Sequence, residues 1–468
     1  MDKKYRRLLS NTAILALGTI GSKLLVFLLL PLYTRCLTKA EYGISDIITQ
    51  SANFLMPIMS LGISDAVFRY TLDKTVDRRK VLTTGFFVNI ACAAVILAVY
   101  PLLGSIAYFD GYMWLIILYT FVANIHSLFA QYVRARGMTT LFAVQGILAT
   151  AITVALNILF LVVFRFGVTG YVLSIVIADA AMALFMTAVV RLDYAIRPRF
   201  FDRVLTKRML RYCVPLMPTT VFWWVTNVSD RYMIKGMIGD DVNGLYSAAF
   251  RIPTMLILLS GIFIEAWQFS AISERDESTK RAHAAFFGKV FDSYQGLLFI
   301  SGAGLIAFSK IFSRILFAED YYTAWMYMPI LIIATVYSGL VTFMGSVYLV
   351  DKKSVQSLVT SMIGAGVNVI LNLILIPTEL GAIGAAIATF FSYFVVFIIR
   401  AKDTRHLIRF PLHTRKLAVN TIILSVQAVT MMSDAPGWIL TQVLGIMIIF
   451  ALNASPIIAG VMKLLKRL

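Results

Sequence analysis

Apolar runs of about twenty residues, separated by short polar connections, recur along the whole chain. A run of this length can cross the hydrocarbon core of a membrane as a helix, whereas a soluble core cannot absorb so many. The runs are continuous in Leu, Ile, Val, Ala and Phe, and a β-barrel would instead show short alternating segments. The pattern predicts an all-α polytopic membrane protein with fourteen transmembrane spans, near residues 10–34, 42–68, 81–104, 113–133, 141–164, 169–190, 212–237, 242–270, 290–309, 322–350, 355–377, 380–399, 416–432 and 437–460.

Basic residues are distributed unevenly between the two sides of this predicted topology. Of the 42 Lys and Arg residues, 33 fall on the side of both termini, six on the opposite side and three inside spans. Cytoplasmic loops of membrane proteins carry the excess of Lys and Arg, so both termini are predicted to be cytoplasmic. The net charge of +18 is then a topology signal, assisted by anionic membrane lipids, and not the footprint of a nucleic-acid partner.

Composition agrees with a membrane protein and adds two exclusions. Hydrophobic residues make up 59% of the chain and charged residues 14%, and the mean hydropathy is +0.82. The basic start resembles a signal peptide, but its apolar run is too long and lacks a cleavage site, so we expect it to remain as the first span. The three cysteines, Cys36, Cys92 and Cys213, are scattered, which indicates neither a disulfide framework nor a metal site.

The chain is predicted to contain an internal repeat. The longest cytoplasmic connection, residues 191–211, separates an N-lobe (1–195, spans one to six) from a C-lobe (196–402, spans seven to twelve), followed by two further spans (403–468). Three short matches occur in order at offsets of 201, 215 and 214: Glu41-Tyr42-Gly43-Ile44 with Val242-Asn243-Gly244-Leu245, Leu156-Asn157-Ile158 with Leu371-Asn372-Leu373, and Gly167-Val168-Thr169-Gly170 with Gly381-Ala382-Ile383-Gly384. Chance remains the alternative, since Gly and Leu-Asn pairs are common. An even number of spans per half predicts two parallel lobes around a central cavity.

Two regions of the sequence resemble a known family. The first contains Gly21-Ser22-Lys23, Pro31-Leu32-Tyr33-Thr34-Arg35 and Lys39-Ala40-Glu41-Tyr42-Gly43. The second contains Asp230-Arg231-Tyr232-Met233, Gly244-Leu245-Tyr246-Ser247-Ala248-Ala249 and Ala266-Trp267-Gln268-Phe269. Together they are similar to the polysaccharide-biosynthesis flippases of the multidrug/oligosaccharidyl-lipid/polysaccharide exporter superfamily. The resemblance covers about the first 400 residues, and the last two spans look more like fourteen-span relatives, including the lipid II flippase branch.

The resemblance implies a function. It implies translocation of an undecaprenyl-diphosphate-linked oligosaccharide from the inner to the outer leaflet of the bacterial cytoplasmic membrane, by alternating access, for the export of cell-surface polysaccharide. Membrane lipids are expected partners, with a polysaccharide polymerase or glycosyltransferases as further candidates. The sugar is left open.

A cation at mid-depth is what a carrier of a lipid diphosphate needs, because the negative headgroup must cross about 30 Å of hydrocarbon. Lys23 fits best: in a helix over 11–35 it lies about 18 Å from either end. Arg231 and Arg251 lie shallower, and an Arg fork can bind phosphate bidentately. Each has a structural alternative. Lys23 can be paired or neutral, Arg231 can pair with an acid on a neighbouring helix, and Arg251, two residues before Pro253, can satisfy carbonyls freed at the kink.

Acidic residues inside spans are candidates for proton or sodium coupling. Asp179 lies near the middle of span six, Glu265 nearer the cytoplasmic end of span eight, and Asp46 in the expected first turn of span two, where the positive end of the helix favours it. Asp179 and Glu265 can equally pair with a cation. His126, in the middle of span four, can titrate, but a lone histidine is more often an interhelical hydrogen bonder.

Polar and aromatic side chains within spans are candidates for binding sugar. Asn157 and Asn372 can hydrogen-bond to a sugar, although Asn more often joins helices in membranes. Trp224 and Tyr246 can stack on sugar faces, with packing or interfacial anchoring as the alternative.

Missing motifs exclude several kinds of enzyme. The sequence has no G-x-x-x-x-G-K-[ST] motif, no H-E-x-x-H and no paired C-x-x-C, so we expect a transporter without an ATPase site and without a bound cofactor.

Two alternative functions remain. A drug or cation antiporter of the same superfamily would be expected to carry an acid deep in span one, where this chain has Lys23. A membrane polysaccharide ligase or polymerase usually needs a large outer loop, and the longest outer connection here, about residues 310–322, is short.

Overall fold

The computed structural model describes residues 27–73, 75–103, 107–109, 111–277, 280–350 and 353–465. These residues form helices and turns, and none of them is in a strand. The predicted all-α polytopic membrane fold is confirmed. Lys23 and most of the predicted first span lie outside the described residues.

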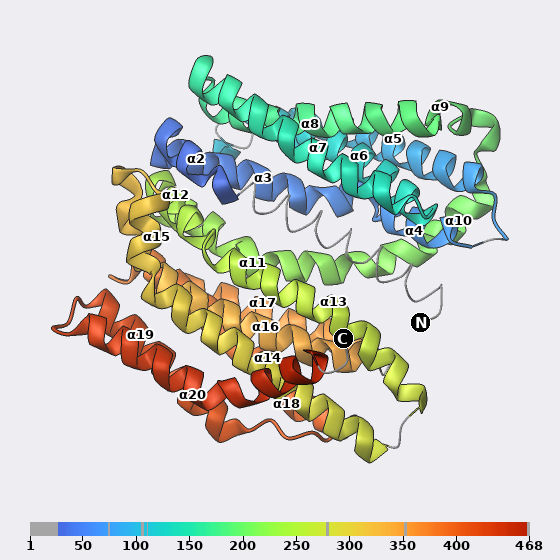
Figure 1. Ribbon diagram of the computed structural model, residues 1–468. Helices are drawn as coiled ribbons and strands as arrows, with labels where there is room; N and C mark the ends of the chain where they lie inside the picture. Colours follow the sequence, from blue (N-terminus) through green and yellow to red (C-terminus); the bar gives the residue numbers. More distant parts are fainter. Residues whose placement is uncertain are drawn as a thin grey trace. The chain divides into compact units, whose positions relative to one another are not determined.

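Helix packing divides the chain into two compact units, which are described separately below: unit 1 (Met1–Trp224) and unit 2 (Val225–Leu468). The division falls inside helix α11 (Met217–Met237). The α-helices of unit 1 that precede α11 are α2 (Leu30–Cys36), α3 (Lys39–Ser60), α4 (Ile63–Thr71), α5 (Arg78–Leu103), α6 (Met113–Ala135), α7 (Thr139–Asn157), α8 (Gly167–Val190), α9 (Leu192–Ala195) and α10 (Arg203–Cys213) (Figure 1). Short 3-10 or π segments are η1 (Ala107–Phe109), η2 (Ile158–Val163), η3 (Pro198–Phe200) and η4 (Val214–Leu216).

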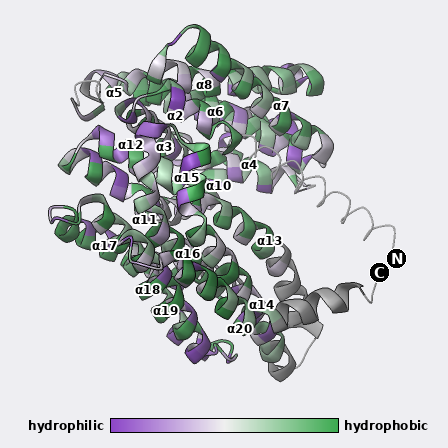
Figure 2. Ribbon diagram, turned by 60° about the vertical axis from the view of Figure 1, so that its left-hand side comes forward, coloured by the Kyte–Doolittle hydropathy of each residue, from purple (hydrophilic) through white to green (hydrophobic). Residues whose placement is uncertain are grey.

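Unit 2 continues with α12 (Asp240–Phe250), α13 (Pro253–Glu277), α14 (Lys280–Ala307), α15 (Ser309–Leu316), α16 (Met328–Val350), α17 (Ser354–Leu375), α18 (Gly381–Asp403), α19 (Thr414–Met432) and α20 (Trp438–Leu465), with 3-10 segments η5 (Glu319–Met326) and η6 (Thr404–His406). The long helices are hydrophobic over much of their length (Figure 2). Within unit 2, α16 packs on α17 and α18, and α13 packs on α16.

Each predicted span from the second onward coincides with one helix or with consecutive helical segments. Eight of the described helices are long and apolar enough to cross a membrane, and ten if each of two bent pairs is one span. This is fewer than the fourteen predicted. One reason is α11, which carries Asp230, Arg231 and Lys235 and is therefore less apolar than its neighbours. A second is α20, whose apolar segment among the described residues is limited to Trp438–Ala454.

The start of α3 explains part of the family-like motif around Glu41. The Thr38 hydroxyl accepts a hydrogen bond from the Glu41 backbone N–H at 3.2 Å, and the Thr38 N–H donates to Glu41 Oε2 at 2.8 Å. Such a reciprocal cap satisfies two free donors at a helix start, and the hydroxyl alone contributes about 0.5–2 kcal/mol. Asp46 was predicted to lie in the first helical turn, and this is wrong. The helix begins at Lys39, so the acid in its first turn is Glu41.

The chain bends by 59° between α3 and α4. Pro57 near the end of α3 lacks a backbone N–H, and the two residues that follow the helix, Leu61 and Gly62, both take left-handed conformations (φ 52° and 66°). The Gly62 N–H donates to the Pro57 carbonyl at 3.0 Å, which closes the helix end. The predicted second span is thus a broken helix.

The glycines of the third repeat match have the same structural roles in the two units. Gly167 and Gly381 both start a helix with positive φ, 55° and 50°. Three residues later, Gly170 and Gly384 each touch the end of the preceding helical segment: a Cβ on Gly170 would lie 2.9 Å from the Phe166 Cβ and 3.1 Å from the Phe160 Cβ, and one on Gly384 would lie 2.8 Å from the Leu375 carbonyl oxygen. The packing order also agrees, since α8 packs on α6 and α7 as α18 packs on α16 and α17. These correspondences support the predicted repeat.

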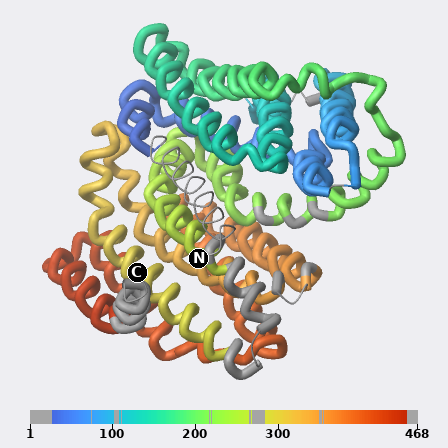
Figure 3. Tube along the Cα trace, turned by 45° about the vertical axis from the view of Figure 1, so that its right-hand side comes forward, coloured from blue at the N-terminus to red at the C-terminus, as the bar shows by residue number. Residues whose placement is uncertain are grey.

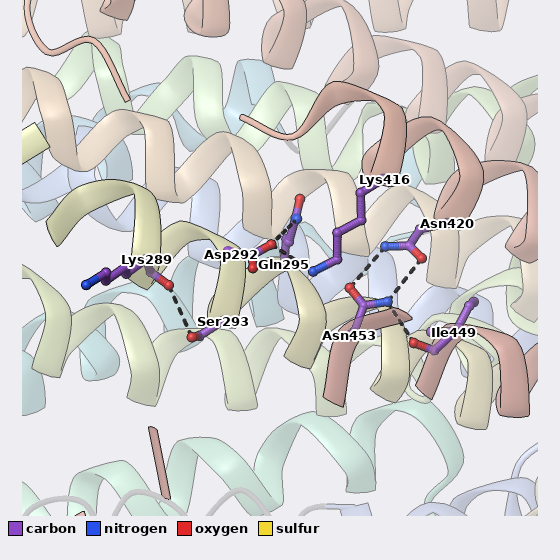
Figure 4. Close-up of polar contacts among 8 residues, drawn as sticks. All are labelled: Lys289, Asp292, Ser293, Gln295, Lys416, Asn420, Ile449 and Asn453. Carbon is purple, nitrogen blue, oxygen red and sulfur yellow. Dashed lines mark hydrogen bonds and ion pairs between the residues drawn. The ribbon is translucent and has the colours of Figure 1, made fainter. Parts of the chain in front are cut away.

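The last two helices pack against α14 and against each other (Figure 3), and polar side chains join the three helices (Figure 4). The Asn420 and Asn453 side-chain amides hydrogen-bond to each other in both directions, at 3.2 and 3.0 Å. Lys416 on α19 forms a 2.8 Å ion pair with Asp292 on α14. Amide pairs of this kind hold helices together in an apolar surrounding.

Candidate functional site

A buried carboxylate lies at the centre of a polar cluster in unit 2. Asp230, on α11, is 1% exposed. Its Oδ2 accepts a 2.5 Å hydrogen bond from the Tyr246 hydroxyl on α12 and lies 3.5 Å from the Thr389 hydroxyl on α18. Its Oδ1 accepts from the backbone N–H of Arg231 at 2.9 Å. A carboxylate is expensive to bury in an apolar region, and these donors offset part of that cost.

The cluster continues onto α17 through amide groups. The Asn368 side-chain amide donates to the Thr389 hydroxyl at 3.2 Å, and the Asn368 Oδ1 accepts from Ser229 at 2.7 Å and from Asn372 at 3.0 Å. Asn368 and Asn372 are fully buried, and the Oδ1 atom of Asn372 has no hydrogen-bond partner among the described residues. Carboxylate, amide and hydroxyl oxygens from four helices, α11, α12, α17 and α18, are thus gathered in one place.

Such a set of oxygens can hold a proton or a hard monovalent cation. Hard cations take oxygen ligands from carboxylates, amide carbonyls and hydroxyls. The described residues contain no group of three or more His, Cys, Asp or Glu side chains that could hold a metal ion.

The two arginines predicted for phosphate binding lie close to this cluster in sequence. Arg231 is 5% exposed, and its guanidinium lies 4.7 Å from the centre of the Phe250 ring. Arg251 lies at the break between α12 and α13, where the two helices bend by 40°. Its backbone carbonyl accepts from the Thr254 hydroxyl at 2.5 Å. Their binding of phosphate stays a prediction.

Unit 1 contains a second, partly buried polar group, formed by one residue from each of α6, α7 and α8. His126 Nδ1 lies 2.9 Å from Asp179 Oδ1, and His126 Nε2 lies 2.7 Å from Gln145 Oε1. The side chains of His126 and Asp179 are 17% and 18% exposed. Each ring nitrogen of His126 thus lies within hydrogen-bond distance of a side-chain oxygen on a neighbouring helix. The prediction that His126 is an interhelical hydrogen bonder is confirmed.

The other predicted residues of unit 1 make helix-joining contacts. Asn157 is fully buried and donates to the Tyr33 hydroxyl at 3.2 Å. The Trp224 indole N–H donates to the Gln50 carbonyl at 3.0 Å, and its ring lies 4.3 Å from that of Phe54. Asp46 is 3% exposed. These contacts match the packing alternative for Asn157 and Trp224, and sugar binding by either residue stays a prediction.

The side chains of two further predicted residues, Lys23 and Glu265, fall outside what the structure describes. Lys23 precedes the first described residue, and only the backbone of Glu265, within α13, is described. Tyr246 was expected to stack on sugar or to pack. It is fully buried and bonded to Asp230.

Sequence reasoning did not find the importance of Asp230, Gln145 or Thr389. Asp230 was noted only as part of the family-like segment Asp230-Arg231-Tyr232-Met233. The spacing of Asn368 and Asn372, four residues apart on one helix face, was a usable signal, because it places two amides side by side. Thr389 carried no signal, since threonines are common in membrane helices and only packing brings this one to Asp230.

These features define a class of protein. The fold is that of a multi-pass helical membrane protein, and it is shared with several solved structures. A lipid II flippase, MurJ, in an inward closed conformation matches with a TM-score of 0.68 at 15% identity, over 96% of this chain and all of that one. A multidrug resistance transporter of the MATE family in the MOP superfamily, in an outward-facing conformation, matches with a TM-score of 0.62 at 14% identity, over 85% of this chain and 95% of that one. A structure of such a transporter in an inward-facing conformation matches with a TM-score of 0.61 at 14% identity, over 85% of this chain and 94% of that one.

The family is set by the sequence itself. Residues 8–268, more than half of the chain, match the family described as polysaccharide biosynthesis protein. The chain belongs to this family, and the resemblance predicted from the sequence is confirmed. No curated protein matches the sequence.

Proposed function

We propose that the protein is a flippase that moves an undecaprenyl-diphosphate-linked oligosaccharide from the inner to the outer leaflet of the bacterial cytoplasmic membrane, for the export of cell-surface polysaccharide. The observation that carries this proposal is membership of the polysaccharide biosynthesis family over residues 8–268. The fold shared with a lipid II flippase supports it, because that protein is itself a flippase for a lipid.

The proposed mechanism is alternating access of an N-lobe and a C-lobe. Lys23, at the calculated middle of the first span, would compensate the diphosphate charge, with Arg231 and Arg251 as further cations and Asn157, Asn372 and Trp224 contacting sugar. The likeness to both an outward-facing and an inward-facing transporter structure supports such a cycle.

We further propose that transport is coupled to an ion. The His126–Asp179 pair is suited to a proton, because it contains two groups that share one at short distance. The oxygens around Asp230 are suited to sodium or to a proton. Glu265 and Asp46 remain candidates on sequence grounds. We place both termini in the cytoplasm, on the basis of the Lys and Arg distribution.

A vesicle assay tests the cargo and the role of Lys23. Purified protein is reconstituted with fluorescent undecaprenyl-diphosphate-linked oligosaccharide, and translocation is followed by enzymatic modification of sugar on the outer face. We expect Lys23→Ala to slow translocation at least tenfold and Lys23→Arg to retain most of it. Lys402→Ala, which removes an exposed lysine at the end of α18, is the matched control. An unchanged rate in Lys23→Ala would remove its assigned role.

The same vesicles distinguish the coupling ion and the main rival. A proton gradient and a sodium gradient are imposed separately, and Asp179→Asn and Asp230→Asn are compared with wild type. Loss of the response to one gradient in one variant assigns that ion to that group. If the protein moves no lipid-linked sugar but exports a cationic dye against a gradient, the antiporter alternative replaces the flippase.

A further inference from the structure

A pocket of about 550 Å³ lies in unit 1. None of the residues that line it belongs to either of the two polar groups described above. It is formed by the start of α5, the end of α6, and the end of α8 with the following α9. The residues that line it are Val76, Asp77, Arg78, Arg79, Tyr132, Arg136, Val190, Arg191, Tyr194 and Ala195. Its volume is within the range of small-molecule sites.

The pocket is strongly basic, with four arginines and one acid. The acid, Asp77, already forms a hydrogen bond. Its Oδ1 accepts from the Arg79 backbone N–H at 2.9 Å and so caps α5. Arg78, Arg79 and Arg136 form no ion pair with any described residue. Arg191 lies 3.7 Å from Asp193, with both side chains more than half exposed, and such a pair contributes little. The N–H groups of these guanidiniums are therefore available to bind a ligand.

Aromatic rings hold several of these arginines in place. The Arg191 guanidinium lies 4.5 Å from the centre of the Tyr194 ring, and the Arg136 guanidinium lies 5.7 Å from that of Tyr132. Arg79 lies 5.8 Å from the Phe200 ring. Cation–π contacts of this kind orient a guanidinium while its N–H groups stay free, which lowers the entropy cost of binding.

The position of the pocket places it at the surface of the membrane. Helices α5, α6 and α8 all have the length and apolar character of membrane spans. The pocket lies where they end, so its depth is that of the lipid headgroups. Three loops contribute to the pocket. All three are among the loops that are predicted to be cytoplasmic from their content of Lys and Arg.

We propose that this pocket binds the phosphate groups of a phosphorylated ligand at the cytoplasmic surface. Arginine forks match phosphate oxygens bidentately, and a net charge of about three positive units suits a diphosphate or a phosphate diester. The ligand is either the headgroup of an anionic lipid or a soluble phosphate or diphosphate compound. The assignment does not depend on which cargo the protein moves.

Binding to the full-length protein in nanodiscs of neutral lipid tests the proposal. Inorganic diphosphate is titrated by calorimetry, and in a second arm cardiolipin is added to the nanodisc and retained lipid is counted by native mass spectrometry. The double variant Arg78→Gln/Arg136→Gln removes two pocket arginines. Lys207→Gln/Arg211→Gln removes two charges from exposed positions on α10, outside the pocket. Arg136→Lys keeps the charge and removes the fork.

We expect the pocket double variant to bind at least tenfold more weakly at low salt, the α10 variant to bind within about twofold of wild type, and Arg136→Lys to fall between them. Diphosphate binding alone assigns a soluble ligand, and cardiolipin retention alone assigns a lipid. Thermal unfolding of each variant verifies that the fold is kept. No binding in either arm, or equal loss in the α10 variant, would overturn the proposal, since the arginines would then act only as a general surface charge.

Discussion

The Nδ1 atom of His126 lies 2.9 Å from Oδ1 of Asp179, and this contact joins α6 to α8 within unit 1. The Nε2 atom is 2.7 Å from Gln145 on α7, so one imidazole connects three helices. A titratable pair that also fixes helix packing can link a proton to a conformational change, because adding or removing the proton alters the bonds between the helices.

We expect this pair to show energetic coupling. Asp179→Asn leaves an acceptor for the imidazole but removes the carboxylate, and should lower the free energy of unfolding by about 1–3 kcal/mol. Unfolding of Asp179→Asn, His126→Gln and the double variant in mixed micelles gives a double-mutant cycle, for which we expect a coupling of at least about 0.5 kcal/mol. Asp193→Asn, at an exposed ion pair, should change stability by about 0–1 kcal/mol. A coupling of zero would show that the two side chains act independently.

The Tyr246 hydroxyl should stabilise unit 2 through Asp230. Tyr246→Phe removes the 2.5 Å hydrogen bond and leaves the buried carboxylate with one donor fewer, so we expect a loss of about 1.5–3 kcal/mol in unfolding free energy. Tyr322→Phe, at a residue that is 38% exposed, serves as the control and should change stability by less than about 0.5 kcal/mol. Equal effects of the two substitutions would contradict the assigned contact.

The close approach at Gly384 predicts intolerance to a side chain. An alanine Cβ there would lie 2.8 Å from the Leu375 carbonyl oxygen, and backbone atoms cannot move aside as a flexible side chain can. We expect Gly384→Ala to cost about 1–3 kcal/mol. Gly366→Ala, on α17 with open space around the new Cβ, should be neutral or stabilising by up to about 1 kcal/mol. Thermal unfolding of the two variants in one detergent checks this contrast.

The connection between α8 and α11 should loosen in acid. The backbone N–H of Leu205, and then Lys80, holds the pKa of the Asp202 carboxyl below its usual 3.8. A lowered pKa in the folded state means that the carboxylate stabilises the cap of α10 above about pH 4, and that this contribution is lost as the pH falls below 3.8. Limited proteolysis by pepsin between pH 4.5 and 2.5 should therefore show faster cleavage in residues 191–211 at the acid end.

Asp202→Asn provides the comparison for this effect. Its side-chain oxygen can still cap the helix but does not titrate, so its cleavage rate in that segment should vary less with pH than that of the wild type. The same pH dependence in both proteins would mean that Asp202 is not the responsible group.

Much of the fold was predictable because the membrane restricts it severely. Apolar runs of about twenty residues located every described span, since a helix is the structure that satisfies its own backbone in lipid. The glycines of the Gly167 and Gly381 turns were visible as a repeat, because a positive φ and a close helix contact both favour glycine. The sequence also carried the family: the segments around Glu41 and Asp230 resemble it, and residues 8–268 match it.

The polar clusters were decided by tertiary structure. His126 and Asp179 are 53 positions apart in the chain, and Asp230 and Thr389 are 159 apart. Hydropathy reports how deep a residue lies but not the direction in which its helix face points, so it cannot tell which distant polar groups meet. The same holds for the basic pocket: the count of arginines indicated a side of the membrane, and only the packing of α5, α6 and α8 brought four of them around one cavity.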